Sequence, residues 1–376
     1  QTRTKVCGPT GLGSTFKPIV FTAAAIRLSV FSQARLIKRR RRNGRVVEQF
    51  TDQTLAKFQR PWPGGTTSDL LARMLLHVDV AGNAFVRDSP GRLHMMRPDR
   101  VTIVLGSQLD EANPAAAEDV EVVGYVYDAD GQSRFYGADE VAHFAPMPDP
   151  QSNYRGMSWM TPIVRDVRAD SAATTHKSKF FTNAATPNLL VSFDMELEFE
   201  KVKAFKELME NDHVGAANAY KTLYLGGGAD ATVIGKDMQE IDFAKTVGKG
   251  ETRILMAAGV HPTIAGASEG LSGSSLNAGN YNAAKRAFSD IHLQHLWTNA
   301  VASLSTLVDG DAGVELWFDK SEIPFLQDDL KDTAEIQAQR AAAIRSLTEA
   351  GYQPQSVVDA IENDDLTQLA HTGVFS

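Results

Sequence analysis

The chain has 376 residues, of which 43% are hydrophobic and 22% charged, and its formal net charge is −8. This length and composition allow a sizeable core and about two or three domains, and the acidic balance argues against a protein whose whole surface binds phosphate. The single cysteine, Cys7, excludes an internal disulfide and suggests neither a metal site nor a nucleophile.

No window approaches the roughly 18 uninterrupted apolar residues of a membrane span, and the start of the chain lacks the order of a signal peptide. We therefore expect a soluble protein made in the cytoplasm, a reducing compartment. The chain begins at Gln1 rather than with methionine, so we expect the natural product to extend beyond both ends.

The first distinctive segment is basic. An apolar stretch from Ile19 to Val30 precedes the run Lys38 to Arg42, and Arg45 follows. Such a run is either a nucleic-acid contact or a solvated helix end or loop, and the second interpretation is favoured for a single run.

A helix followed by strands is expected next. Apolar residues recur at helical spacing from Ser68 to Val80, with Ser68 as the cap. Short β-prone runs separated by turn residues then predict an antiparallel meander, which is mostly scaffold. The expected strands are Ala84 to Arg87, Leu93 to Met96, Val101 to Leu105, Val120 to Tyr127 and Ser133 to Tyr136.

A long helix follows, in which Thr161 is the expected cap and Pro162 the first helical residue. No glycine or proline interrupts the chain before Pro187, which predicts about twenty helical residues, on the order of 30 Å. The middle of this helix is rich in alanine, serine and threonine, which favours close helix packing. Lys177 and Lys179 then face either a channel or water, with water slightly favoured.

The next segment contains a triple glycine. An amphipathic helix is expected from Glu198 to Met209, followed by strands at Thr222 to Leu225 and Ala231 to Ile234. Gly226 to Gly228 between these strands suggests a phosphate-binding loop, but no Gly-Lys-Ser/Thr follows, so a hairpin turn is favoured.

Residues 237 to 259 are expected to be largely helical, with an irregular patch at Gly248 to Gly250. Beyond them, the segment Gly266 to Gly279 contains four glycines and four serines and is expected to be mobile. A long helix from Tyr281 to Leu307 follows it directly, so the loop is mounted on a rigid element.

The end of the chain is expected to form one short strand, Val314 to Phe318, and two helices, Leu326 to Leu347 and Ser356 to Glu362. Both helices lack a strong catalytic pattern. Asp328 with Asp329, and Asp364 with Asp365, are sequence neighbours that do not share a helix face, so capping or solvated surface explains them better than acid–base catalysis.

The sequence contains few candidate catalytic residues. His292 and His295 lie three apart on a helix and both could reach one metal ion, but no third ligand is evident and packing or surface is the favoured interpretation. No Gly-x-Ser-x-Gly elbow occurs. The sequence therefore predicts no enzyme, no metal and no cofactor.

The ordered combination of segments over about residues 65 to 320 resembles the portal, or head-tail connector, proteins of tailed double-stranded DNA bacteriophages. The motifs that carry the resemblance are Gly82 to Val86, Glu140 to Phe144 leading to Arg155 to Ser158, Phe180 to Pro187, Gly259 to Pro262, Asn277, and the helix Phe288 to Leu307. One departure is that His295 or a neighbour replaces the proline that is usual midway along that last helix.

The resemblance implies an α+β portal fold that assembles into a ring of subunits, typically twelve. It divides the chain into a strand-rich N-terminal wing, a helical stem, a small α/β clip, a tunnel loop with its helix, and a C-terminal helical crown. The implied ranges are 1–155 for the wing, 156–187 and 237–262 for the stem, 188–236 for the clip, 263–325 for the tunnel loop, long helix and wing return, and 326–376 for the crown.

The same resemblance implies roles for particular residues. The tunnel loop would face DNA through weak polar contacts that carry no base information, with Glu269 adding local repulsion. The implied loop residues are Ser268, Glu269, Ser272, Ser274, Ser275, Asn277 and Asn280. Lys177 and Lys179 are the stem candidates for facing the channel, and the clip candidates for docking partners are Glu207, Glu210, Asp212 and Lys221.

The implied function is a channel at one capsid vertex for DNA entry during packaging and exit during ejection, in a virion assembled in the host cytoplasm. The implied partners are further copies of the chain, double-stranded DNA, the terminase large subunit, the major capsid protein and the head-tail adaptor, with no membrane. The alternatives are another structural virion protein, such as a capsid or tail-tube subunit, and a metal-dependent nucleic-acid enzyme that uses His292 and His295.

Overall fold

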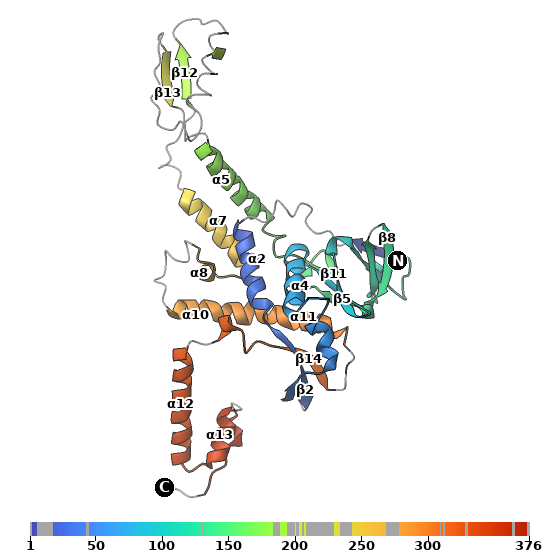
Figure 1. Cartoon of the computed structure of the whole chain (residues 1–376), viewed down its shortest axis with the longest axis vertical. Coiled ribbons are helices and arrows are strands. Elements are labelled where there is room, and N and C mark those ends of the chain that lie inside the picture. The colour runs from blue at the N-terminus through green and yellow to red at the C-terminus, as the bar shows by residue number, and fades with distance from the viewer. Residues whose placement is uncertain are drawn as a thin grey trace. The chain divides into compact units, whose positions relative to one another are not determined.

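The computed structural model forms two compact units, Gln1–Lys320 and Ser321–Ser376. It describes residues 2–5, 18–42, 45–129, 131–182, 189–193, 200, 203–204, 207, 229–233, 243–267, 278–308, 310, 313–327, 330–362 and 365–373. Helices and strands are both abundant (Figure 1), which confirms the α+β class. Every strand pairing among the described residues is antiparallel.

Helix α4, Thr67–Ala81, packs beside a three-stranded sheet of order β5-β4-β9. Its N-cap is Thr66, whose hydroxyl accepts from the Asp69 amide while the Asp69 carboxylate accepts from the Thr66 amide. This reciprocal pair satisfies the helix start, so the expected cap at Ser68 is wrong. The strands are β4 (Ala84–Ser89), β5 (Arg92–Met96) and β9 (Val141–Phe144), and the short helix α3 (Ala56–Gln59) precedes α4.

A second sheet has the order β1-β6-β7-β8, so the expected single meander is two sheets. Pro98 opens a 3₁₀ turn, Pro98–Arg100, that separates the first hairpin from the second group of strands, because proline fixes φ and cannot donate to a ladder. These strands are β1 (Thr2–Lys5), β6 (Val101–Gly106), β7 (Glu121–Ala129) and β8 (Gln132–Gly137).

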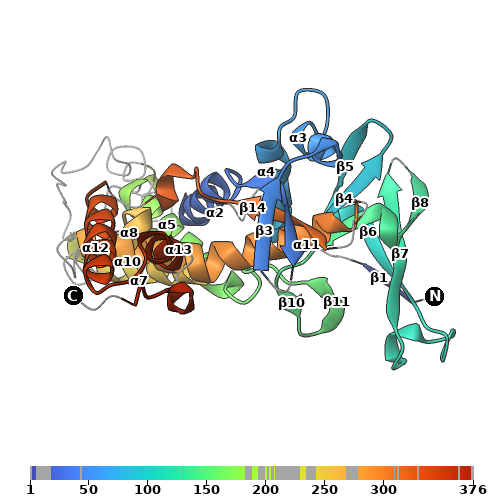
Figure 2. The same ribbon diagram turned by 90° about the horizontal axis from the view of Figure 1, so that it is seen from below.

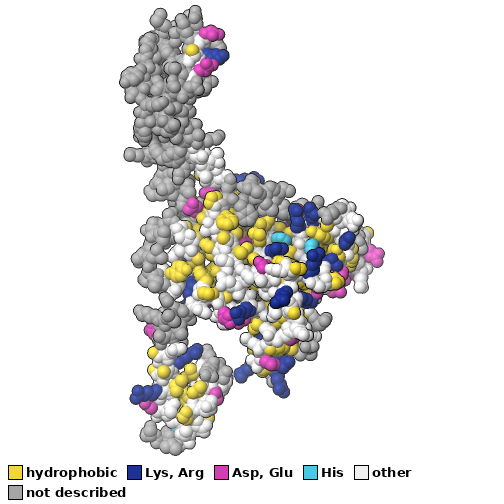
Figure 3. Space-filling view, in the orientation of Figure 1, with side chains coloured by type: hydrophobic (Ala, Val, Ile, Leu, Met, Phe, Trp, Pro, Cys, Tyr) yellow, Lys and Arg dark blue, Asp and Glu magenta, His cyan; other side chains and the backbone are white. Residues whose placement is uncertain are grey.

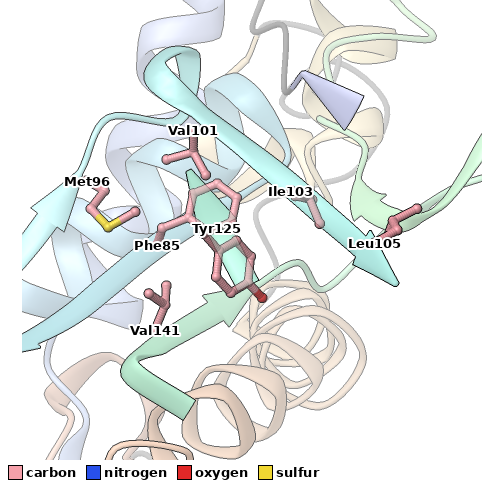
Figure 4. Close-up of a cluster of buried hydrophobic side chains, with 7 residues drawn as sticks. All are labelled: Phe85, Met96, Val101, Ile103, Leu105, Tyr125 and Val141. Atoms are coloured by element: carbon pink, nitrogen blue, oxygen red, sulfur yellow. The ribbon is translucent and has the colours of Figure 1, made fainter. Parts of the chain in front are cut away.

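A cluster of buried apolar side chains joins the two sheets (Figure 4). Phe85 comes from the first sheet and meets Tyr125 of the second edge-on, with ring centroids 5.4 Å apart. The other members are Met96, Val101, Ile103, Leu105 and Val141. Burial of such side chains contributes about 1.5–3 kcal/mol each, so this cluster fixes the position of one sheet on the other.

The basic run lies in a third sheet of order β14-β2-β3. Strand β2 is Arg35–Arg42, β3 is Arg45–Phe50 and β14 is Val314–Asp319. The expected helix end or loop at Lys38 to Arg42 is therefore wrong. Carboxylates of neighbouring segments neutralise part of the run, since Glu315 and Glu48 pair with arginines across the strands and Asp52 pairs with Lys38. The strand expected from Val314 is confirmed.

Further helices of the first unit pack partly on these sheets and partly on one another. Figure 1 shows α5 beside α7, and α10 and α11 as one rod. Figure 2, seen from below, shows β14 and β3 in front of α11, and β14 packs on α11. The bounds are α2 (Pro18–Phe31), α5 (Val164–Thr182), α7 (Phe243–Ala257), α8 (Pro262–Ala265), α10 (Ala278–Ala287) and α11 (Gln294–Ser305).

Two of these helices, α5 and α7, differ from expectation. Helix α5 begins at Val164 because Thr161 belongs to a preceding turn, in which its amide donates to the Ser158 carbonyl. Helix α7 continues through Gly248 to Gly250, so the expected irregular patch is wrong. Each glycine costs about 1 kcal/mol relative to alanine, and packing of α7 against α5 and α2 outweighs it.

The expected long helix from Tyr281 is present but starts at Ala278 and is interrupted by a π turn, Phe288–Leu293. Within this π turn the amide of Gln294 donates to the carbonyl of Ser289, five residues back. A π turn inserts one extra residue into a helix. The sequence carries no proline or glycine there to announce it.

A two-stranded sheet pairs β12, Leu189–Phe193, with β13, Ala229–Val233. Strand β13 confirms most of the strand expected from Ala231, while β12 was not expected. Thr222 to Leu225 and the triple glycine lie outside the described residues, and of the helix expected from Glu198 to Met209 only Glu200, Lys203, Ala204 and Glu207 are described as helical. A further small pair is β10 (Pro148–Asp149) with β11 (Ser152–Gly156).

The second unit consists mainly of α12, Leu330–Glu349, packed on α13, Pro354–Glu362. Val357 and Ala360 of α13 are fully buried. The Gln353 amide, just before α13, donates to the Ala370 carbonyl and so connects the segments before and after this helix. Both expected helices are thus confirmed, with the first starting four residues later than Leu326. Within the described part of the chain, no helix is long and apolar enough to span a bilayer.

Candidate functional site

Most of the loop residues singled out by the sequence lie outside the described residues. These are Ser268, Glu269, Ser272, Ser274, Ser275 and Asn277. Asn280 is described, and it is exposed in the first turn of α10. The described chain thus supplies the two ends of the loop, Ala267 and Ala278, and the contacts that hold them.

The base of the loop is built from α7, α8 and the π turn. The chain leaves α7 through Gly259, which has φ of 77°, and a Cβ there would lie 2.4 Å from Nδ1 of His292. His261 then accepts from the Thr263 amide at 3.2 Å and caps α8. Gly259 is thus required twice, for its left-handed backbone and for the close approach of His292.

A buried ion pair ties this base to two other helices. Arg27 of α2 makes a two-pronged contact with Asp79 of α4, at 2.9 and 3.2 Å, and also donates to the carbonyl of Ala258 just after α7. Their exposed fractions are 6% and 2%. Burial raises the pKa of the Asp79 carboxyl, and the Arg27 guanidinium offsets part of that shift.

Asn83 forms a second buried polar junction, between α4, β9 and β11. Its side-chain amide donates to the carbonyl of Gly156 at 2.9 Å, and its Oδ1 accepts from the Gly156 amide at 2.7 Å. Oδ1 also lies 3.0 Å from Nε2 of His143, and because that oxygen only accepts, Nε2 carries the proton. Burial lowers the pKa of His143 to about 4, so the ring is neutral near pH 7.

Neither junction is predicted by the sequence pattern. Asp79 gave a signal, since it is a carboxylate beside the apolar face of a helix, one residue after Val78. The sequence pattern places Asn83 only at the start of a strand. Its position directly after Gly82, which ends α4 with φ of 73°, is the feature that identifies it as a residue binding neighbouring backbone.

The candidate stem residues Lys177 and Lys179 lie on α5, where only their backbone is described. Asp166 of α5 pairs with Arg253 of α7 at 3.0 Å. Farther along α5, Ala169, Ala172 and Thr175 are exposed. This ion pair joins the two helices, and the small side chains of Ala169, Ala172 and Thr175 remain open in a single chain.

The candidate docking residues are described only in part. Glu207 is helical and exposed, whereas Glu210, Asp212 and Lys221 lie outside the described residues.

The structure also places the two histidines that were considered as metal ligands, His292 and His295. His295 has Nε2 3.0 Å from the carbonyl of Pro146, and His292 packs on Gly259, so both make packing contacts. In the described ranges, no three His, Cys, Asp or Glu side chains gather as a metal site.

A small pocket of about 200 Å³ lies where α4 meets β10 and β11. Its charged lining residues are Asp149 and Arg155, which pair with each other at 2.7 Å. Asn83 and Ser158, also in its lining, are engaged with backbone groups. These four side chains of the pocket therefore already have protein partners, which is typical of a structural junction.

Comparison with known proteins gives one family. The family model described as phage portal protein matches residues 18–350. No curated protein sequence matches the chain.

Solved structures share the fold. A chain in the neck of the empty gene transfer agent (GTA) particle, computed with C6 symmetry, is 22% identical with a TM-score of 0.64, and covers 94% of this chain and 93% of its own length. A chain in the virion of the native GTA particle is 21% identical with a TM-score of 0.61. The match covers 90% of this chain and 92% of that chain. An HK97 family phage portal protein from Corynebacterium diphtheriae is 12% identical with a TM-score of 0.54. The match covers 83% of this chain and 95% of that chain. Since the family model spans most of the sequence, the chain belongs to the phage portal protein family.

Proposed function

We propose that this chain forms a closed ring at one vertex of a capsid and that duplex DNA enters and leaves through the ring. The observation that carries the proposal is the family match over residues 18–350. The portal family is structural and non-enzymatic, which favours a conduit over the metal-enzyme alternative. The family match also favours a portal protein over a capsid or tail-tube subunit.

The proposed ring contains twelve subunits. Related neck structures of the GTA particle were computed with C6 and with C12 symmetry, and closed rings arise when one surface of a subunit binds a different surface of the next. In this arrangement the exposed small residues of α5 pack between neighbouring subunits, because alanine and serine allow helices to approach closely.

The domain ranges of the proposal follow the resemblance. Residues 1–155 form the wing, 156–187 and 237–262 the stem, 188–236 the clip, 263–325 the tunnel loop with its helix and the wing return, and 326–376 the crown. The pairing of α5 with α7 through Asp166 and Arg253 supports a two-helix stem.

The loop at the DNA is proposed to act through weak polar contacts. Serine and asparagine side chains hydrogen-bond to phosphate without adding positive charge, and each neutralised phosphate would strengthen an attachment that sliding must break. Ser268, Ser272, Ser274, Ser275, Asn277 and Asn280 supply these contacts, and Glu269 adds repulsion. Lys177 and Lys179 are the stem candidates for facing the channel.

The clip is proposed to dock the packaging machinery and later the tail. Glu207, Glu210, Asp212 and Lys221 are its candidate contact residues for the terminase large subunit and the head-tail adaptor. The wing would contact the major capsid protein. Assembly would take place in the host cytoplasm, and the finished ring would reside in the virion.

The first test is the assembly state of the full chain. Electron microscopy with native mass measurement should show closed rings of about twelve subunits, with a hole wide enough for a duplex roughly 20 Å across. A monodisperse monomer or dimer across several salt conditions would overturn the ring.

The second test addresses the loop. Ser274→Lys with Ser275→Lys should slow DNA packaging severalfold while rings still form, since each lysine adds a phosphate contact to a sliding surface. Gln132→Lys with Ser133→Lys adds the same charge on the exposed hairpin of β7 and β8 and should leave the rate unchanged. Equal rates in both variants would remove the loop from the channel.

A further inference from the structure

The hairpin of β2 and β3 concentrates positive charge. Residues 35 to 50 contain seven basic side chains and one acidic one, in a chain whose formal net charge is −8. Figure 3 shows Lys and Arg side chains gathered at the end of the first unit where β2 lies in Figure 1. The proposed channel function does not use this charge.

The first part of the run is structural. Lys38 is 3% exposed and pairs with Asp52 at 2.8 Å. Arg39 is also buried, pairs with Glu315, and lies over the ring of Trp317 at 3.2 Å from the centroid. These two side chains hold β2 to its surroundings and are unavailable to a ligand.

The outer part of the run is different. Arg40, Arg41, Arg42 and Arg45 are exposed and form what we call the arginine tip. Arg40 pairs with Glu48 at 2.6 Å, and Arg41 pairs at 2.8 Å with the Glu315 carboxylate that Arg39 already uses. The two carboxylates, Glu48 and Glu315, therefore pair with three guanidinium groups, those of Arg39, Arg40 and Arg41.

Arg42 and Arg45 are paired directly opposite each other across the two strands. Like charges in that position destabilise a sheet. Within the described part of the chain, Arg42 forms no ion pair. An anion that binds at this end of the sheet, next to Arg42, offsets the repulsion between the two opposite arginine positions.

We infer that the arginine tip binds the phosphate backbone of duplex DNA outside the channel. The guanidinium group matches phosphate oxygens with two parallel hydrogen bonds. Alternate residues of a β-strand lie about 6.6 Å apart, and residues opposite each other on two β-strands lie about 5 Å apart. The tip therefore offers several donors to successive phosphates of one DNA strand.

The composition of the tip favours DNA over a protein partner. Contacts between proteins are depleted of charge at their centre, whereas contacts with DNA are polar and strongly positive. The tip offers arginine on both faces of a two-stranded ribbon. The inference rests on the proposed function, which brings duplex DNA close to the ring.

The test uses full-chain rings and a fluorescent, covalently closed circle of duplex DNA, which cannot thread through a channel. Wild-type rings should bind the circle with an affinity that falls steeply with salt. Arg42→Gln with Arg45→Gln should weaken binding roughly tenfold or more near 0.1 M salt and reduce the slope of log affinity against log salt by about 1.8.

A matched control is Arg134→Gln with Arg345→Gln, which removes the same charge from exposed arginines elsewhere and should change affinity less than twofold. Equal losses in both variants, or none in the first, would overturn the inference. Unchanged DNA binding together with failed ring assembly in Arg42→Gln with Arg45→Gln would identify the tip as a contact between subunits instead. Failure of the wild-type chain to form rings would count against the proposed function and not against the tip.

Discussion

The region around Asn83 and helix α5 differ in how completely their side chains are buried within a single chain. Around Asn83, the side chains of Asn83 and Ser158 have hydrogen-bond partners at close range, and large apolar side chains pack between the two sheets. Helix α5 is 19 residues long, yet Ala169, Ala172 and Thr175 lie open to solvent in the single chain. The first region is complete within one subunit, whereas the second gains burial only from something outside the chain. Substitutions in the two regions should therefore differ in what they damage.

The largest expected effect on the free energy of unfolding is at the buried ion pair of Arg27 and Asp79, which lies on helix α4 next to the first region. Arg27→Leu leaves the Asp79 carboxylate buried without its partner, which should lower the free energy of unfolding by about 3–5 kcal/mol. The midpoint of urea denaturation measures this loss.

The double variant Arg27→Leu with Asp79→Leu is the control. It removes both charges, so most of the stability should return. A cost below about 1 kcal/mol in the single variant would mean that water reaches Asp79 and that the first region is less closed than its contacts indicate.

A smaller effect in the same region depends on pH. His143 stacks on Phe85, with ring centroids 4.4 Å apart, and burial lowers its pKa from the ordinary value of 6.5 to about 4 in the folded chain. The unfolded chain therefore binds more protons between these values, so stability is fully present above about pH 6.5 and is lost as the pH falls toward 4.

Denaturation of the wild type at pH 7.5 and pH 4.5 should differ by about 1–3 kcal/mol from this group. His143→Gln removes the titration, so the part of the pH dependence due to His143 should vanish in that variant. An identical pH dependence in both chains would show that His143 titrates alike in the folded and unfolded states.

The smallest effect on a single subunit is expected on α5. Ala169→Glu with Ala172→Glu changes two exposed positions three residues apart on one helix face. The free energy of unfolding of the subunit should change by less than about 0.5 kcal/mol, while the fraction of protein in rings should fall sharply, because charges would be buried between neighbours. Sedimentation and native mass measurement separate the two outcomes.

Ala112→Glu with Ala115→Glu provides matched charges in the exposed segment between β6 and β7 and should leave rings intact. Intact rings in the α5 variant as well would remove the contrast between the regions, since α5 would then face solvent in the assembly.

The sequence predicted elements whose signal is local. Helix α4 and the strands from Ala84 to Tyr136 were found because apolar spacing and turn residues determine them. The basic strand β2 was missed because its neutralising partner Glu315 lies more than two hundred residues away. The helix cap at Thr66 was missed by two residues, because Ser68 is an equally suitable residue type.

The candidate site was predictable only through the resemblance. Polarity of the loop was visible in the sequence, but the junctions that anchor it depend on distant partners, such as Arg27 with Asp79 and Ala258. Their geometry is a property of tertiary packing, to which the local pattern contributes little. The π turn is a similar case, because nothing between Phe288 and Leu293 differs in kind from ordinary helical sequence.

The π turn has a consequence for how this gene tolerates change. Each residue of an α-helix advances the side chains by about 100° around the axis, so the extra residue between Phe288 and Leu293 sets the rotational phase between α10, which contacts α8, and α11, which contacts β9 and β14. Deleting one codon there would restore a regular helix and rotate the α10 faces by about a quarter of a turn relative to α11. The length of this segment is therefore under tighter constraint than the identity of its exposed residues.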